Sequence, residues 1–275
     1  MSEITQIGRH GIEAVMVKGI TLVLMLLLLA PIVMVVVMSF TAATTLQFPP
    51  PGLSLRWYEE VWALLTGPDA AIARLGESLA VSLQIATATA IVCVLAGVPA
   101  SYALVRLRFR GRGFVEELLG LPVVFPTVVL GVALLMLVSL SGLDLGMVQI
   151  VIAHAIIALP FMMRNCMASM QDIDPALQEA AKTLGASSVR AFVEIVLPLA
   201  REGIVSGALL VFVISFNEFT LSYFLYTIDV FPLSIWLFQQ SNTSFSPAVF
   251  AVSTLTIVIT VAVILAVDLL AGRKR

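Results

Sequence analysis

Six long segments with almost no charge dominate this sequence. The first covers residues 19–40, and the others are 78–105, 116–141, 145–165, 203–226 and 247–269. A helix of twenty residues is about 30 Å long, which matches the hydrocarbon core of a bilayer. Lipid offers no partner for an unpaired backbone amide, so each segment is expected to be helical. The sequence predicts an all-α membrane protein with six transmembrane helices in a single domain over residues 1–275.

The composition supports a membrane protein over a water-soluble one. Hydrophobic residues make up 60% of the chain and charged residues only 12%. One water-soluble core could not bury that much apolar surface. The first segment is also too long for the apolar region of a secretory signal, which has about 7 to 15 residues. It is therefore predicted to be a retained span.

The basic residues indicate the orientation of the chain. Thirteen of the fifteen lie before the first span, between the second and third, between the fourth and fifth, or after the sixth. Only Arg56 and Arg74 fall on the other side, between the first two spans. Loops rich in Lys and Arg stay in the cytoplasm. Both termini are therefore predicted to be cytoplasmic.

Two short helices are predicted in the cytoplasmic segment between the fourth and fifth spans. Asp174 is a typical N-cap for the first helix, and Gly185 is placed to end it. Ser187 or Ser188 can cap the second helix, which we expect to stop at Pro198. The result is a helix, a glycine turn and a second helix outside the bilayer.

One face of the first short helix is small and apolar. This face is formed by residues spaced three or four apart around the helix, namely Leu177 with Ala180 and Ala181, and these alanines with Leu184. Such a face fits a groove on another protein. The alternative is a helix that rests on lipid headgroups, but those helices are usually rich in basic residues, and this one carries only Lys182.

Fixed positions in this segment carry a family resemblance. They are Glu179, Ala180, Ala181, Gly185, Ile195, Leu197 and Pro198. Here the segment 171–201 resembles the cytoplasmic EAA loop of ATP-binding-cassette importer permeases, in which Glu-Ala-Ala, Gly and Ile-x-Leu-Pro recur at this spacing. The resemblance implies a type I importer permease, with these residues forming a coupling loop that docks in a cleft of an ATPase subunit.

The resemblance covers nearly the whole chain, although less specifically. Residues 52–58, 78–81, 99–106 and 121–126 look like the spermidine/putrescine-type permeases. Importers of thiamine, iron, opines and aminophosphonates share much of this pattern and remain alternatives. The resemblance implies ATP-driven, binding-protein-dependent import by alternating access of a small organic solute, such as a polyamine or related cationic amine.

The chain lacks the residues of an ATPase and is expected to be a transport subunit rather than an enzyme. A phosphate-binding loop needs Gly-Lys-Ser/Thr, but Lys182-Thr183 follows an alanine. No catalytic or metal-ligand cluster is evident, since His10 and His154 are the only histidines. The resemblance implies a bacterial inner-membrane protein with three kinds of partner: a second permease subunit, an ATPase dimer that binds ATP and Mg, and an extracytoplasmic solute-binding protein. No nucleic-acid partner is expected.

Glu218 is the charged residue most relevant to a solute, because it lies inside the fifth span next to Asn217. A carboxylate at the centre of a bilayer costs at least about 2.5 kcal/mol, so it is expected to face a cavity or a partner. Our hypothesis is that both residues line the translocation path. Two alternatives stay open: Glu218 pairs with a helix of the second permease, or the chain is a self-sufficient secondary transporter. His154 is expected to be a hydrogen-bonded packing residue.

Overall fold

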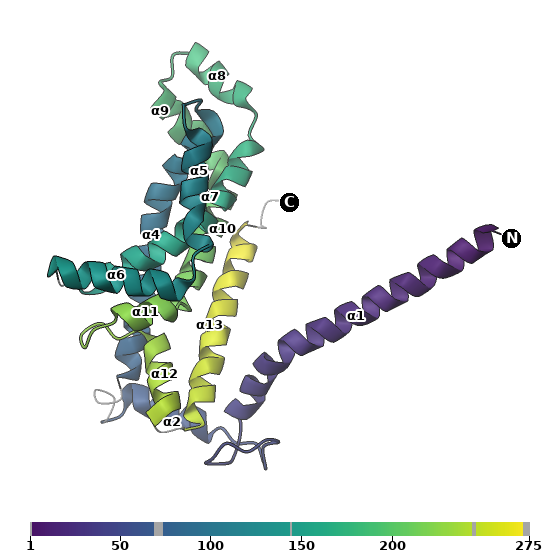
Figure 1. Cartoon of the computed structure of the whole chain (residues 1–275), viewed down its shortest axis with the longest axis vertical. Coiled ribbons are helices and arrows are strands. Elements are labelled where there is room, and N and C mark those ends of the chain that lie inside the picture. Colours follow the sequence, from purple (N-terminus) through teal and green to yellow (C-terminus); the bar gives the residue numbers. More distant parts are fainter. Residues whose placement is uncertain (1, 69–73, 144, 244–245, 272–275) are drawn as a thin grey trace. The chain divides into compact units, whose positions relative to one another are not determined.

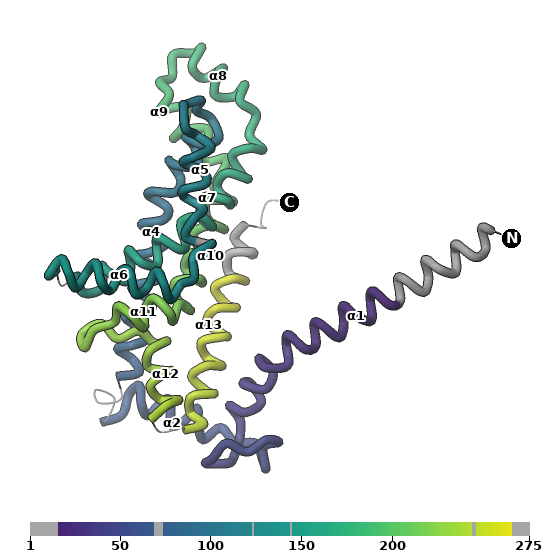
Figure 2. Tube along the Cα trace, viewed as in Figure 1, coloured from purple at the N-terminus to yellow at the C-terminus, as the bar shows by residue number. Residues whose placement is uncertain are grey.

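Helices make up most of the described part of the chain (Figures 1 and 2). The computed structural model describes residues 2–68, 74–143, 145–243 and 246–271. Within these ranges it describes every side chain except those of residues 2–15, 123 and 266–271. Its elements are α1 (Ser2–Ser39), α2 (Arg56–Thr66), α4 (Leu75–Arg106), α5 (Arg112–Gly120), η1 (Leu121–Val123), α6 (Thr127–Ser141), α7 (Met147–Gln171), α8 (Pro175–Thr183), α9 (Ser188–Ala191), η2 (Phe192–Val196), α10 (Leu197–Phe216), α11 (Thr220–Leu225), α12 (Leu233–Thr243) and α13 (Ala248–Ala271). The all-α fold class is confirmed.

Five of the described helices are long and apolar enough to cross a bilayer. They are Met16–Ser39 within α1, α4, α7, the continuous run Ser188–Phe216, and Ala248–Leu265 within α13. Each overlaps one of the predicted spans 19–40, 78–105, 145–165, 203–226 and 247–269. Each of these five predicted spans therefore contains an apolar helix, whereas the bounds of the spans and the count of six stay predictions.

The third predicted span, 116–141, is not one helix. It is divided into the end of α5, the single turn η1 and the fifteen-residue α6, and α5 and α6 run in different directions (Figure 1). Two prolines cause the division. Pro122 lies in the first turn of η1, and Pro126 precedes α6 with an extended ψ of 124°. Proline has no amide hydrogen to donate within a helix, and it disfavours the helical conformation of the residue before it.

The charges that set the orientation are only partly visible. Residues 273–275 lie outside the described residues, as does the side chain of Arg9. Arg108 and Arg110, between α4 and α5, are exposed. The cytoplasmic placement of the termini therefore stays a prediction.

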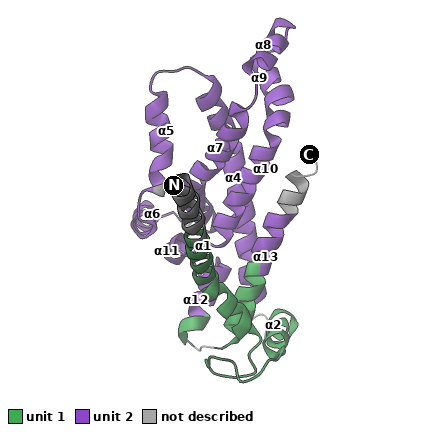
Figure 3. Cartoon of the chain, turned by 90° about the vertical axis from the view of Figure 1, so that its right-hand side faces the viewer, with its two compact units in different colours: residues 1–68, 240–257 green, residues 69–239, 258–275 purple. Residues whose placement is uncertain are grey.

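Two compact units make up the chain (Figure 3). The first contains residues 1–68 and 240–257. Within it, the indole of Trp57 is buried and donates to the carbonyl of Thr41 at 2.8 Å, and Ser39 and Tyr58 share a hydrogen bond of 2.7 Å. These bonds fold α2 back onto the end of α1.

The second unit contains residues 69–239 and 258–275, and its core is formed by α4, α7 and α10. Glycines let α10 approach α7 closely. A Cβ atom added at Gly203 would lie 2.7 Å from the carbonyl oxygen of Asn165, and one at Gly207 would lie 2.8 Å from the sulfur of Met162. Without a hydrophobic force between helices in lipid, such close packing is what holds spans together. At one end of these helices lie α8 and α9 (Figures 1 and 3).

Candidate functional site

The helix α8 is closed at both ends by its own sequence. The carboxylate of Asp174 accepts from the amide of Ala176 at 2.9 Å, which caps the first turn. At the other end Gly185 has φ +93°, and the amides of Gly185 and Ala186 donate to the carbonyls of Lys182 and Ala181. This is a Schellman motif, and its left-handed position suits glycine. Both predicted ends of this helix are confirmed.

The second short helix differs from the expectation. Ser187 caps it by accepting from the amide of Arg190 at 3.2 Å. It does not stop at Pro198, because α9, η2 and α10 form one continuous helix from Ser188 to Phe216. The residues 192–196 form a π turn directly before the proline. A wider turn re-routes the hydrogen bonds that a proline would break, so the helix continues.

Side chains at the end of the second span hold α8 and the turn that leads into it. The amide nitrogen of Gln178 donates to the hydroxyl of Tyr102 at 3.0 Å, and the Tyr102 ring lies 4.5 Å from that of Phe192. Arg106 donates through Nη2 to the carbonyl oxygen of Met170 in the last turn of α7, at 2.9 Å, and to that of Ile173 between α7 and α8. These anchors were not predicted from the sequence. Their only sequence signal is that Tyr102 and Arg106 lie one turn apart.

The outer face of this segment is exposed and apolar. Leu184 is 89% exposed and Val189 72% exposed, with Leu177 and Val193 about half exposed, at 48% and 49%. The predicted coupling residues fall into two groups: Glu179, Ala180, Gly185 and Pro198 are exposed, while Ala181, Ile195 and Leu197 are half-buried. Exposed apolar side chains of this kind are suited to binding another protein.

A break in the fifth span holds the other predicted residues. The helix α10 ends at Phe216, and α11 starts at Thr220, so the expected continuous helix over 203–226 is wrong beyond residue 216. Asn217 folds its side chain back onto the carbonyl of Val213 at 2.8 Å, which competes with the next helical turn. Glu218 is half-buried, and its Oε1 accepts from the amide of Leu221 at 3.1 Å.

A row of buried, hydrogen-bonded polar side chains lies next to this break. His154 on α7 is 1% exposed, and its Nδ1 lies 2.8 Å from Ser215 Oγ while its Nε2 lies 3.2 Å from Ser222 Oγ. Ser215 Oγ lies 3.3 Å from Thr89 Oγ1, and Ser222 donates to the carbonyl of Glu218 at 2.9 Å. The prediction that His154 is a hydrogen-bonded packing residue is confirmed.

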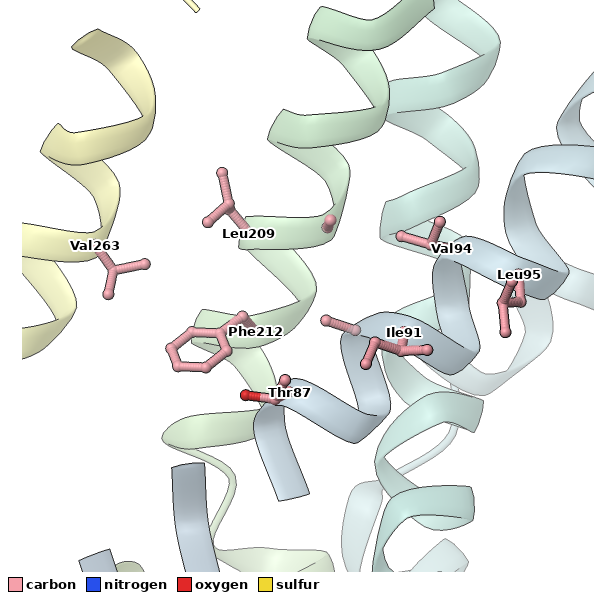
Figure 4. A pocket seen from close by; sticks show the side chains of 9 residues that line it. Thr87, Ile91, Val94, Leu95, Leu209, Phe212 and Val263 are labelled. Carbon is pink, nitrogen blue, oxygen red and sulfur yellow. The ribbon is translucent and has the colours of Figure 1, made fainter. Parts of the chain in front are cut away.

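An apolar cavity of about 410 Å³ lies in the second unit (Figure 4). Its lining comes from α4, α10 and α13 and includes Ile91, Leu95, Phe212 and Val263. The only polar side chain in that lining is Thr87. Glu218 does not line this cavity, and a lining without charge offers no partner to a charged solute. Nor do the described residues contain a group of three His, Cys, Asp or Glu side chains that could hold a metal ion.

Comparison with known proteins decides the family. Residues 93–275, which include both candidate regions, match the model of the binding-protein-dependent transport system inner membrane component. The chain belongs to this family. The permease is 32% identical over 223 residues to the spermidine/putrescine transport system permease protein PotC of Haemophilus influenzae, covering 81% of this chain and 84% of that protein.

A relative with a different solute and two solved structures complete the comparison. The permease is 37% identical over 142 residues to the molybdate/tungstate transport system permease protein WtpB of Pyrococcus abyssi, covering 52% and 57% of the two chains. A bacterial ABC transporter involved in the import of alginate contains a similar fold, with TM-score 0.66, 20% identity and coverage of 92% and 94%. So does the MetNI methionine ABC transporter, with TM-score 0.64, 16% identity and coverage of 74% and 97%.

The two candidate regions of the permease lie at opposite ends of α10. Twenty residues of helix separate Leu197 from Phe216, which is about 30 Å. The structure therefore brings Glu179, Gly185 and Pro198 near one end and Asn217 and Glu218 near the other. The helices α7 and α10 connect the two regions.

Proposed function

We propose that this permease is the membrane-spanning subunit of an ATP-driven, binding-protein-dependent importer, in which an ATPase acts on the segment Asp174 to Pro198. The observation that carries the proposal is the exposed apolar face of this segment, held in place by the Schellman turn and by Arg106. Its Glu-Ala-Ala and glycine positions also match the loop that performs this task in the family. A rigid face transmits force, because it does not deform when its partner moves.

The proposed complex contains more than this chain. A cytoplasmic ATPase dimer binds ATP and Mg, a second permease subunit completes the path, and an extracytoplasmic solute-binding protein delivers the solute. Both termini are cytoplasmic in this proposal, in a bacterial inner membrane, because the basic residues concentrate on that side. Transport follows alternating access, with the path opening to one side as the ATPases close and to the other as they part.

The proposed solute is a small cationic amine, in the class of spermidine and putrescine. Two observations support it: the similarity to PotC extends over most of both chains, and Glu218 offers a carboxylate at the break in the fifth span. The second candidate is an oxyanion, favoured by the similarity to WtpB over about half of the chain. A carboxylate in the path repels an anion, which favours the amine.

A co-purification experiment tests the ATPase contact. The chain is expressed with its ATPase, and the complex is isolated in detergent from the wild type and from Glu179→Lys and Gly185→Asp. Both variants alter the exposed segment without touching a span, so we expect the ATPase to be lost while the permease is still inserted. Gly111→Asp is the matched control, because Gly111 also has a positive φ, of 86°, and open space around it. Retention of the ATPase by both segment variants would contradict the proposal.

A further inference from the structure

His154 bridges the two sides of the break in the fifth span. It lies on α7, whereas Ser215 belongs to the last turn of α10 and Ser222 to α11. All three side chains are nearly completely buried, with exposed fractions of 1%, 3% and 0%. One ring therefore holds the ends of two helices between which Glu218 lies.

Each ring nitrogen of His154 faces a serine hydroxyl. Nε2 lies 3.2 Å from Ser222 Oγ, which donates its proton to the carbonyl of Glu218 at 2.9 Å. Nδ1 lies 2.8 Å from Ser215 Oγ, which donates to Thr89 Oγ1 at 3.3 Å. The ring therefore joins two hydroxyls that are themselves held by further hydrogen bonds, one on α10 and one on α11.

The backbone of Glu218 is fixed by the same set of bonds. Its carbonyl oxygen accepts from Ser222 and also from Ser234 on α12, at 2.9 and 3.2 Å. Ser215 is in turn tied to Thr89 on α4. The backbone that carries the Glu218 carboxylate is therefore connected to the core helices by hydrogen bonds through Ser222 and His154.

His154 on α7 is also bonded to Ser215 on α10, and both of these helices lead into the exposed segment at their other ends. The helix α7 ends at Gln171, three residues before α8, and α10 is continuous with α9. We infer that His154 is a positioning residue, which keeps α7, α10 and the Glu218 carboxylate in one body when the coupling segment moves. This inference rests on the proposed function, since it assigns His154 a part in the same transport cycle.

The test measures solute transported per ATP hydrolysed by the reconstituted complex. His154→Leu keeps the bulk of the side chain but removes both bonds, and His154→Gln keeps one donor and one acceptor. We expect His154→Leu to assemble with basal ATP hydrolysis within about twofold of wild type, and its ratio of solute to ATP to fall about tenfold, as the loss of two buried hydrogen bonds implies. His154→Gln should stay within about threefold of wild type. Cys166→Ala, also buried on α7 but outside this set of bonds, is the control and should match wild type.

Two outcomes would overturn the inference: an unchanged ratio in His154→Leu, or a loss in His154→Gln equal to that in His154→Leu. If His154→Leu does not assemble, Ser222→Ala takes its place, and an unchanged ratio there has the same meaning. Hydrogen exchange gives a readout without transport. The amides of residues 218–222 should exchange about tenfold faster in His154→Leu, and equal exchange contradicts the positioning role. Absence of ATP-driven uptake by the wild-type complex would refute the proposed function instead, and exchange would then decide the inference.

Discussion

At the scale of single residues, Glu218 has one observed task and one proposed task, and they can be separated. Its Oε1 accepts from the amide of Leu221, and in the proposed function its charge attracts the solute. An amide side chain retains an acceptor oxygen but has no charge. A substitution by glutamine therefore removes one task and keeps the other.

We expect Glu218→Gln to reduce the uptake of a cationic amine about tenfold at low solute concentration, because one charge contact of 1 to 2 kcal/mol is lost. The measurement is initial uptake rate in cells or proteoliposomes, with assembly of the complex checked in parallel. Asn217→Ala is a useful companion, since Asn217 bonds only to its own helix through its side chain nitrogen. Wild-type rate and affinity in an intact Glu218→Gln complex would contradict the role in the path.

Tyr102 carries the second residue-scale prediction. Tyr102→Phe removes the acceptor for Gln178 but keeps the ring that packs on Phe192. A buried hydrogen bond contributes about 1 kcal/mol, so the amides of α8 should exchange about fivefold faster with solvent. Tyr102→Ala, which also loses the ring contact, should exceed this effect. Unchanged exchange in both variants would mean that α8 is not anchored through Tyr102.

These residue contacts mark the limit of what the sequence reveals. The caps at Asp174 and Gly185 were predictable, because each forms bonds within a few residues of itself. The bond from Gln178 to Tyr102 joins residues 76 apart, and no local pattern indicates it. Site residues that act through distant contacts therefore need the folded chain.

At the scale of elements, hydrophobicity predicted where apolar helices lie but not where they bend. The segment 116–141 is apolar almost throughout, yet Pro122 and Pro126 divide it. Pro198 was expected to end a helix and does not, because a π turn precedes it. Pro122 and Pro126 thus interrupt one helix, whereas the helix that contains Pro198 continues past it. The difference depends on the hydrogen bonds of the turn before each proline.

The close packing of α10 on α7 gives a prediction at this scale. Gly203→Ala places a Cβ against the backbone of Asn165, at 2.7 Å, and should destabilise the protein by about 1 to 3 kcal/mol. Gly113→Ala is the control, because Gly113 lies in the helix α5 with no atom within 4 Å of the added carbon. Thermal unfolding in detergent compares them. Equal midpoints for the two variants would show that the helices do not need the glycine.

At the scale of the whole molecule, the chain is a permease of the binding-protein-dependent transport family. In the proposed function, the exposed segment from Asp174 to Pro198 is the part of the permease on which an ATPase acts. The helices α7 and α10 connect that segment to the break at Glu218 over about 30 Å. We expect the energy of transport to enter at one end of these helices and to act on the solute at the other.

Uptake by the reconstituted complex tests this account most directly. Proteoliposomes containing the permease, its second permease subunit and the ATPase are supplied with the solute-binding protein and labelled putrescine or spermidine. The account predicts accumulation that requires ATP hydrolysis and disappears with Gly185→Asp. Accumulation of the amine by the purified chain alone, without ATP, would contradict it and indicate a secondary transporter.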